Sequence, residues 1–286
     1  MEERALGVIG GSGLYDLPAL TQRREHRIDT TFGAPSDVVM EGWLGTTRLL
    51  FLPRHGRGHR LAPHEINYRA NVLALKQLGA EQIVSVSAVG SLREDVHPGD
   101  VVVVDQFLDR TRLRPSTFFE GLGVVAHVAF ADPTDAALSS ALELAATDAG
   151  AKVHHGGTYV CIEGPQFSTR AESRLYQGWG ASVIGMTNLP EARLAREAQL
   201  PYATMAMVTD YDAWRAEEAG VSVADVIAML HRNVDLARRT ITALAPKLPD
   251  PAASPAVHAL DHALLSTTVS AEARAKLGHL IPPALP

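Results

Sequence analysis

The sequence predicts an α/β fold built on a parallel or mixed β-sheet. Short apolar runs that suit strands alternate with runs of helical spacing along most of the chain. Several of these strand-like runs end directly in loops rich in glycine or polar residues, as the strands of open α/β sheets do where they meet a ligand. Residues 101–105, four valines and an aspartate, are typical of a strand buried on both faces.

The first half of the chain supplies three further strands and one helix. The helix is predicted over residues 63–78, because Ile66, Ala70 and Leu73 recur at helical spacing. Gly79 follows as a residue suited to end it. The strands are predicted at residues 5–9, 48–52 and 82–87.

The second half continues the alternation. Strands are predicted at 158–162 and 202–208, and helices at 135–149, 168–176 and 191–199. A long helix is expected to begin at Ser222, where Asp225 completes a capping box, and to stop at Pro246. We therefore predict one domain over residues 1–246. Residues 247–286 are predicted to form a proline-rich linker and a short helical tail, with Ser270 as its cap.

Composition narrows the class of protein. With 46% hydrophobic and 20% charged residues among 286, the chain can bury a core and is not of the disordered class. The net charge of −6 and the absence of a dense basic run argue against a nucleic-acid groove. A single cysteine, Cys161, excludes an internal disulfide and favours a reducing compartment. No signal-peptide pattern or membrane-spanning apolar run is visible, so we expect a cytoplasmic protein without membrane partners.

Two glycine-rich loops are candidates for holding an anion. Residues 10–13 read GGSG, where glycines allow unusual backbone conformations and Ser12 adds a hydroxyl donor, but a tight turn explains the loop equally well. Residues 54–60 hold three arginines and two histidines. Arg54 and His55 stand directly at a strand end and suit a phosphate, whereas Arg57 and Arg60 fit a solvated loop better. A metal site for the histidines lacks nearby cysteine or carboxylate ligands.

Two polar strand ends complete the candidate set. Ser87 and Ala88 end the strand at 82–87, where they either complete an anion site or pack against a helix. Residues 209–212 read TDYD, and carboxylates at the end of a buried strand must be paired, solvated or protonated. A protonated Asp210 is a general acid, the group that a departing heterocycle requires, although a helix cap or a metal ligand pair also fits.

Six short segments, taken together, are more specific than any one loop. They are IGGSGL at 9–14, RHG at 54–56, GSLRE at 90–94, EGPQFS at 163–168, MTNLPE at 186–191 and TDYD at 209–212. In this order they resemble the trimeric purine nucleoside phosphorylase family, and within it the methylthioadenosine phosphorylases. The resemblance implies a single α/β domain with a mixed, partly barrel-like sheet, a homotrimer, and phosphorolysis in which phosphate attacks C1′ and the purine leaves. It implies no metal and no organic cofactor beyond inorganic phosphate as co-substrate.

The resemblance also implies roles for individual residues. The residues that would line the phosphate are Ser12, Arg54, His55, Ser87, Ala88 and Thr187. Those that would contact the nucleoside are Phe167, Met186, Thr209, Asp210, Asp212, Val223, Val226 and His127. Asp210 and Asp212 would act at N7 and the 6-amino group of the purine, Val223 and Val226 would lie near the 5′ substituent, and His127 would reach a neighbouring subunit's substrate.

The same positions separate the substrates of the family. Relatives that prefer 6-oxopurines carry Asn at position 210, so Asp there favours adenine. Relatives that use ordinary nucleosides carry a His where Val223 stands, and an apolar side chain suits a methylthio group but leaves a hydroxyl unpaired, at a cost of about 1–3 kcal/mol. We therefore predict phosphorolysis of 5′-deoxy-5′-methylthioadenosine to adenine and 5-methylthioribose 1-phosphate.

Alternatives of the same and of other classes stay open at this point. One is action on adenosine, inosine or methylthioinosine, and another is a nucleoside-binding protein without turnover. The complete set of acid and phosphate residues argues against the second. A dinucleotide-dependent dehydrogenase is weaker still, because the glycine fingerprint is incomplete.

Overall fold

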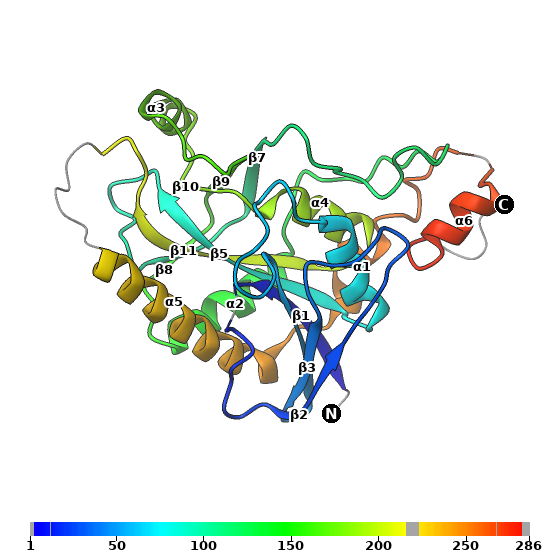
Figure 1. Cartoon of the computed structure of the whole chain (residues 1–286), viewed down its shortest axis with the longest axis horizontal. Helices are drawn as coiled ribbons and strands as arrows, with labels where there is room; N and C mark the ends of the chain where they lie inside the picture. The colour runs from blue at the N-terminus through cyan, green and yellow to red at the C-terminus, as the bar shows by residue number, and fades with distance from the viewer. Residues whose placement is uncertain (1–2, 12, 216–222, 267, 282–286) are drawn as a thin grey trace.

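A branched mixed sheet forms the centre of the molecule. The computed structural model describes residues 3–11, 13–215, 223–266 and 268–281, with the backbone alone for 223–231. β1 (Arg4–Gly10) lies between β4 (Thr47–Pro53) and β5 (Gln82–Ser91) and is parallel to both. β11 (Tyr202–Tyr211) runs parallel to β5 along nearly its whole length (Figure 1). The carboxyl ends of these four strands therefore lie on the same side of the sheet.

The remaining strands extend this centre in three directions. β2 (Thr21–His26) and β3 (Val39–Leu44) add antiparallel strands beyond β4. β10 (Val183–Gly185) pairs with the last two residues of β5 and leads to β9 (Thr158–Ile162) and β7 (Gln106–Arg110). β6 (Val101–Val103) pairs antiparallel with β11 and carries β8 (Val153–His155). A mixed sheet flanked by helices confirms the predicted fold class.

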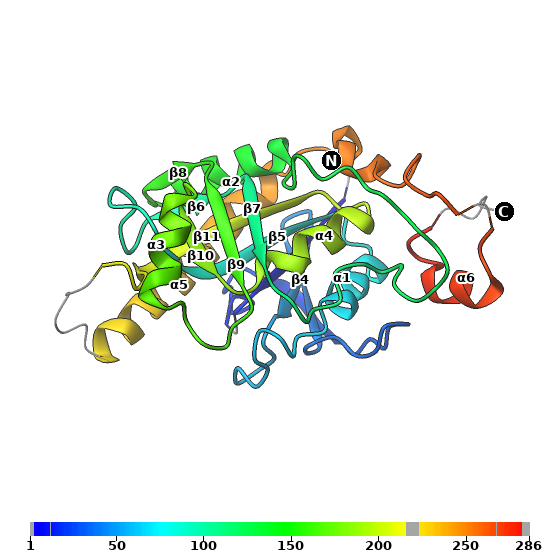
Figure 2. The same cartoon turned by 90° about the horizontal axis from the view of Figure 1, so that it is seen from above.

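Both faces of the central strands are buried, because each faces a pair of helices. Along β11, Met205 and Met207 contact the core formed with α2 (Ala136–Asp148) and α5 (Val223–Leu244). Ala206 and Val208 contact the core formed with α1 (Tyr68–Gln77) and α4 (Asn188–Glu197). Figures 1 and 2 show these helix pairs on opposite sides of the sheet. The valines of β6 divide between the two cores in the same way, as their apolar run predicted.

Helix boundaries differ from the prediction where a polar side chain caps the backbone. α1 begins at Tyr68, five residues later than expected, because the Asn67 side chain accepts a hydrogen bond from the Ala70 amide. α3 (Arg170–Gly178) begins after a capping box of Thr169 and Glu172. The predicted start of α5 at Ser222 lies outside the described residues. Its buried stripe is confirmed where described, at Ala237, Ile241 and Leu244.

Five strands were missed, for two physical reasons. β2 has the sequence TQRREH and is exposed or half-exposed throughout, so no apolar alternation marks it. β8 and β10 have three residues each, too short for a pattern. β3 and β7 hold few consecutive apolar residues. The strand predicted at 101–105 is shorter than expected, since β6 ends at Val103.

The C-terminal segment packs against the main body through its own apolar residues. After α5 it forms the 3₁₀ turns η1 (Ala245–Lys247), η2 (Pro251–Ala253) and η3 (Pro255–His258) and then α6 (Ala271–Leu277). Leu260 and Leu277 join the core that holds α1 and α4. Ser270 caps α6, as predicted. The division at residue 246 stays a prediction.

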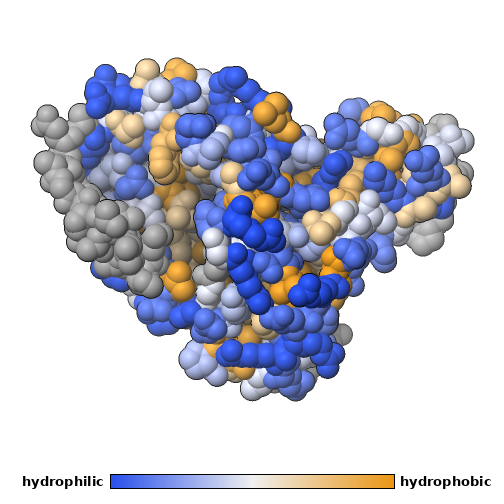
Figure 3. Space-filling view, in the orientation of Figure 1, coloured by the Kyte–Doolittle hydropathy of each residue, from blue (hydrophilic) through white to orange (hydrophobic). Residues whose placement is uncertain are grey.

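The outline of the molecule reflects this tail. In Figures 1 and 3, α6 and the segment around it form a lobe at the right that stands apart from the helices over the sheet. Among the described residues, no helix is both long and apolar enough to cross a membrane.

Candidate active site

The predicted loops gather because their strands end together. Gly10 and Pro53 are register partners at the ends of β1 and β4, and the Arg54 amide donates to the Gly10 carbonyl at 2.9 Å. On β5 and β11, Ala206 faces Ser87 and Asp210 faces Gly90. The parallel region thus brings the loops after four strands to one edge, where α/β sheets bind ligands.

Arg54 lies inside the protein in a paired state. It is 2% exposed, and its Nε donates to Glu191 Oε2 at 2.8 Å. Its terminal nitrogens donate to Ser85 Oγ at 2.6 Å and to the carbonyls of Val86 and Ile9. Burial opposes the charge, but Glu191 more than compensates, so the pKa of Arg54 lies above its ordinary value. Sequence reasoning missed Glu191, which lies 137 residues further along the chain; its place in the MTNLPE segment was the available signal.

The other two arginines of this loop behave as a solvated pair of charges. Arg57 Nη2 donates to Glu25 Oε1 at 2.6 Å, and the two side chains are 42% and 48% exposed. Arg60 donates to the Ser36 carbonyl and is exposed. This confirms the prediction of a solvated loop for both.

A buried amide organises the end of β5. Asn188 is fully buried, and its Oδ1 accepts a hydrogen bond from Ser87 Oγ at 2.9 Å. Its Nδ2 donates to Tyr202 Oη and Thr204 Oγ1, both at 2.6 Å. Thr187 comes immediately before, at the N-cap of α4, and its side chain makes no capping bond. A hydroxyl at the amino end of a helix is well placed for an anion.

His55 is held in one tautomer. Its Nδ1 is 2.8 Å from the Leu61 carbonyl, which can only accept, so Nδ1 carries the proton. Burial lowers the pKa of His55 to about 4, and the charges of Arg54 and His59 lower it further, against the opposing effect of the Leu61 carbonyl. At neutral pH the ring is therefore neutral, with Nε2 as an acceptor. His59 stacks on it at 4.2 Å between ring centroids.

The end of β11 carries the two carboxylates. The pairing with β5 shifts register between Val208 and Asp210, and such a bulge redirects the side chains that follow. Thr209 Oγ1 lies 2.6 Å from Asp210 Oδ1 and 3.2 Å from the Val89 carbonyl. Asp212 is 6% exposed, and its Oδ2 has no hydrogen-bond partner among the described residues.

The protonation of Asp210 follows from these surroundings. The residue as a whole reaches solvent, but burial of its carboxyl raises the pKa above the ordinary value. The charge of Asp212 adds to the rise, and the hydrogen bond from Thr209 opposes it. The predicted direction of this shift is confirmed.

An arginine that the sequence analysis did not single out joins two of the loops. Arg114 is 8% exposed and donates to the carbonyls of Met186 at 2.6 Å and Leu189 at 2.8 Å. It also donates to the Glu163 carboxylate at 2.9 Å, so it fixes the segments at 163–168 and 186–191 to one another. Because its partners lie 49 to 75 residues away, only the tertiary structure identifies it.

The predicted nucleoside residues lie in different settings. Met186 is half-buried, and its sulfur would be 2.6 Å from a Cβ on Gly164, whose φ is +68°. Phe167 is 84% exposed, and Ala88 is also exposed. His127 is exposed, and its amide donates to the Ala263 carbonyl of the C-terminal segment rather than joining the strand-end loops.

Three predicted residues cannot be placed in this arrangement. Ser12 lies outside the described residues. Val223 and Val226 belong to the first turns of α5, where the backbone alone is described. Their expected roles stay predictions. In the described part of the chain, no three His, Cys, Asp or Glu side chains form a group that could hold a metal ion.

Comparisons with known proteins agree along the chain. A family model described as the phosphorylase superfamily matches residues 5–246. The S-methyl-5′-thioadenosine phosphorylase of Geobacter sulfurreducens is 50% identical over 281 residues, 98% of either chain. A crystal structure of a methylthioadenosine phosphorylase from an antarctic soil metagenomic library superposes with a TM-score of 0.93 at 47% identity, over 98% of this chain and all of the other. The Schistosoma mansoni methylthioadenosine phosphorylase in complex with tubercidin gives 0.79 at 37%, over 86% and 92%.

Proposed function

Because the chain belongs to the phosphorylase superfamily, we propose that it cleaves 5′-deoxy-5′-methylthioadenosine with inorganic phosphate. The products are adenine and 5-methylthioribose 1-phosphate. The observation that carries this proposal is Asp210, a carboxyl of raised pKa at the end of β11, beside the buried Asp212. The predicted family and the assignment as a phosphorylase enzyme are confirmed by the comparisons, whereas the site roles below are proposals.

Phosphate binds at the ends of β1, β4 and β5. Ser12, Ser87 and Thr187 supply hydroxyls, and the amide groups around Ala88 line the same edge. Arg54 contributes a fixed positive charge, and its pairing with Glu191 holds the guanidinium in place before phosphate arrives. Such preorganised donors stabilise charge without reorganising during the reaction.

His55 acts as a hydrogen-bond acceptor for phosphate. Its Nδ1 proton is committed to the Leu61 carbonyl, so Nε2 presents a lone pair. A monoanionic phosphate can donate its P–OH hydrogen to that nitrogen. The bound phosphate then attacks C1′ with its unprotonated oxygens as positive charge develops on the sugar.

Asp210 donates the proton that the leaving purine needs at N7. The Thr209 hydroxyl has one hydrogen and two acceptors within reach, Val89 O and Asp210 Oδ1. When that hydrogen goes to Val89 O, Asp210 must itself be the donor to Thr209, which requires a protonated carboxyl. The contact thus favours the acid form that catalysis uses.

Specificity follows from the same edge. Asp212 Oδ2 has no hydrogen-bond partner among the described residues, and it accepts a hydrogen bond from the 6-amino group of adenine. Met186 and Phe167 flank the ribose and the purine. Val223 and Val226 surround the methylthio group.

The working enzyme is a homotrimer in the cytoplasm that needs no metal or organic cofactor. His127 closes the 5′ end of the site in a neighbouring subunit. In support, Val125 and Leu265 leave apolar side chains 47% and 62% exposed beside His127, on a surface that a second chain can cover. One buried cysteine without a disulfide is consistent with a reducing compartment.

A product assay tests the proposal. Methylthioadenosine, adenosine, inosine and methylthioinosine are supplied in parallel, with and without phosphate, and the released base is measured. Adenine from methylthioadenosine, released only with phosphate and with the highest kcat/KM of the four, is expected. Faster release of hypoxanthine, or release without phosphate, would refute the assignment.

A further inference from the structure

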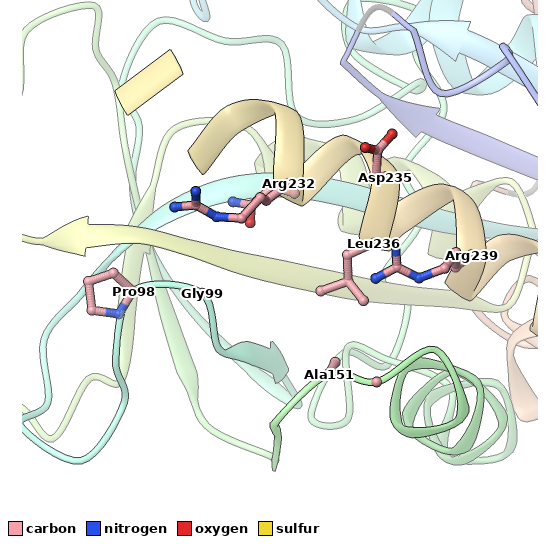
Figure 4. Close-up of a pocket in the computed structure, with 9 residues that line it drawn as sticks. Pro98, Gly99, Ala151, Arg232, Asp235, Leu236 and Arg239 are labelled. Atoms are coloured by element: carbon pink, nitrogen blue, oxygen red, sulfur yellow. The ribbon is translucent and has the colours of Figure 1, made fainter. Parts of the chain in front are cut away.

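A second pocket lies under α5, and none of the proposed active-site residues lines it. It has a volume of about 410 Å³, within the range of small-molecule sites. Figure 4 shows α5 on one side and, facing it, the turn at Pro98 and Gly99 together with Ala151. The pocket therefore joins three elements that are far apart in the sequence.

Two arginines reach this pocket from α5. Arg232 and Arg239 are seven residues apart, which places them on the same face of the helix two turns from one another. Arg239 Nε donates to the Ala149 carbonyl at 3.2 Å, so the stem of its guanidinium is fixed. No other bond of Arg239 is found among the described residues, and its two terminal nitrogens are available to a ligand.

A buried amide between the arginines asks for an acceptor. Asn233 also lines the pocket and is 7% exposed, yet its Nδ2 has no hydrogen-bond partner in the described part of the chain. A buried donor left unsatisfied is costly. The pocket wall does not supply the acceptor, and an incoming oxygen atom can.

The carboxylate of the pocket does not cancel this charge. Asp235 Oδ1 is 3.3 Å from Arg238 Nη1. In Figure 4 its carboxylate points away from Gly99 and Ala151. The side of α5 that faces the pocket thus presents two guanidinium groups and one amide, all of them donors. The backbone amide of Gly99 is already committed to the Val208 carbonyl.

We propose that this pocket binds a phosphate group, either inorganic phosphate or the phosphate of a small sugar phosphate. Guanidinium forks match phosphate oxygens in geometry and charge, and the Asn233 amide supplies a further donor. Occupancy ties α5 to the turn at Pro98. Through the hydrogen bonds of Gly99 and Asp100 with Val208, the ligand also stabilises the strand that precedes Thr209.

Equilibrium dialysis with radiolabelled inorganic phosphate tests this site. The wild-type chain is expected to bind one more phosphate per chain than the Arg232→Gln/Arg239→Gln double variant. Asn233→Asp, which keeps the shape but adds a negative charge, should lose the same phosphate. Ribose 5-phosphate added as competitor separates the two sources: it displaces this phosphate if the site accepts sugar phosphates and leaves it bound if the site takes the free ion.

The control removes two positive charges elsewhere. Arg93→Gln/Lys247→Gln changes exposed residues that are paired with Asp95 and Asp148, and it should bind as many phosphates as the wild type. Equal binding by the wild type and by Arg232→Gln/Arg239→Gln would overturn the proposal. The difference between chains, not the total, is the test, so a wild type with one phosphate and a variant with none supports this pocket while counting against a phosphate site at the strand ends.

Discussion

At the scale of single residues, the site depends on three ionisable groups in unlike surroundings. Arg54 is buried against a carboxylate, His55 is buried without one, and Asp210 lies beside a second acid. Each is therefore held in one protonation state by its neighbours. The consequences differ for activity and for stability, so each group can be tested separately.

Replacing Asp210 by Asn should remove the acid and keep the shape. A general acid contributes about 10²–10⁴-fold, and kcat/KM for methylthioadenosine should fall by that range. Because the amide can donate to a 6-oxo group, the ratio of methylthioinosine to methylthioadenosine activity should rise. Steady-state assays of both substrates measure this. Wild-type turnover of methylthioadenosine in the variant would transfer the acid role to Asp212 or to water.

Replacing Arg54 by Gln should act on folding as well as on phosphate. It leaves Glu191 buried without its cation, which costs about 3–5 kcal/mol of unfolding free energy. The matched change Arg57→Gln breaks an exposed pair and should cost less than about 1 kcal/mol. Urea unfolding compares the two. In any folded Arg54→Gln enzyme, KM for phosphate should rise more than KM for nucleoside, and an equal effect on both would contradict a phosphate role.

His55 predicts a pH dependence of stability. Its folded pKa of about 4 lies below the unfolded value near 6.5, so the unfolded chain binds more protons between these pH values. Stability should therefore fall as pH drops from 6.5 towards 4. The cost is about 1–2 kcal/mol after allowing for solvent screening. Urea unfolding of wild type and His55→Gln at pH 7 and 4.5 measures it, and identical slopes in the two proteins would exclude this source.

At the scale of elements, the loops after β9 and β10 form one unit because Arg114 joins them. The Arg114 guanidinium bonds to the carbonyls of Met186 and Leu189 and to Glu163. Close packing at Gly164 leaves room for the Met186 sulfur. A small change in one loop should therefore move the other.

Gly164→Ala tests this coupling. The new Cβ would lie 2.6 Å from Met186 Sδ, and the residue has φ of +68°. Displacing Met186 should raise KM for the nucleoside about 10-fold, which corresponds to about 1.4 kcal/mol, with less effect on KM for phosphate. Gly121→Ala is the control, because its φ is +72° and nothing lies within 4 Å of the new Cβ. Both variants should lose about 1–3 kcal/mol of stability, and a normal nucleoside KM in Gly164→Ala would show that Met186 does not contact the sugar.

At the scale of the whole molecule, the C-terminal segment and the segment that holds His127 form one surface. Ala126 and Leu264 form a β-bridge, and the Leu265 amide donates to Val125 O at 2.9 Å. This pairing keeps His127 away from the strand-end loops of its own chain. A role for His127 in catalysis therefore requires a second chain.

Sedimentation equilibrium should show three chains of 30.6 kDa each. His127→Ala should raise KM for methylthioadenosine while the trimer persists, because only the 5′ end of the neighbouring site loses a contact. Asp261→Ala, an exposed change in the same segment, is the control. A fully active monomer would contradict both the assembly and the role of His127.

The sequence by itself determined the fold class, the strands that carry the site and the chemistry of their ends. Apolar runs such as residues 101–105 and 202–208 identify strands whose two faces are buried, and this information is local. The loops at residues 54–56 and 209–212 are equally local, since each follows its strand directly. Solvation of Arg57 and Arg60 could also be predicted, because exposed charges need no specific partner.

Only the tertiary structure decided which groups these residues meet. The pairing of Arg54 with Glu191, the three loop contacts of Arg114 and the amide network of Asn188 join residues that are 11 to 137 positions apart. The exposed strand β2 exists because β3 offers it a partner, not because of its own pattern. Local preference records how a segment can fold, whereas burial of a charge depends on what the rest of the chain places beside it, and that is why the partners of the site could not be found from the sequence.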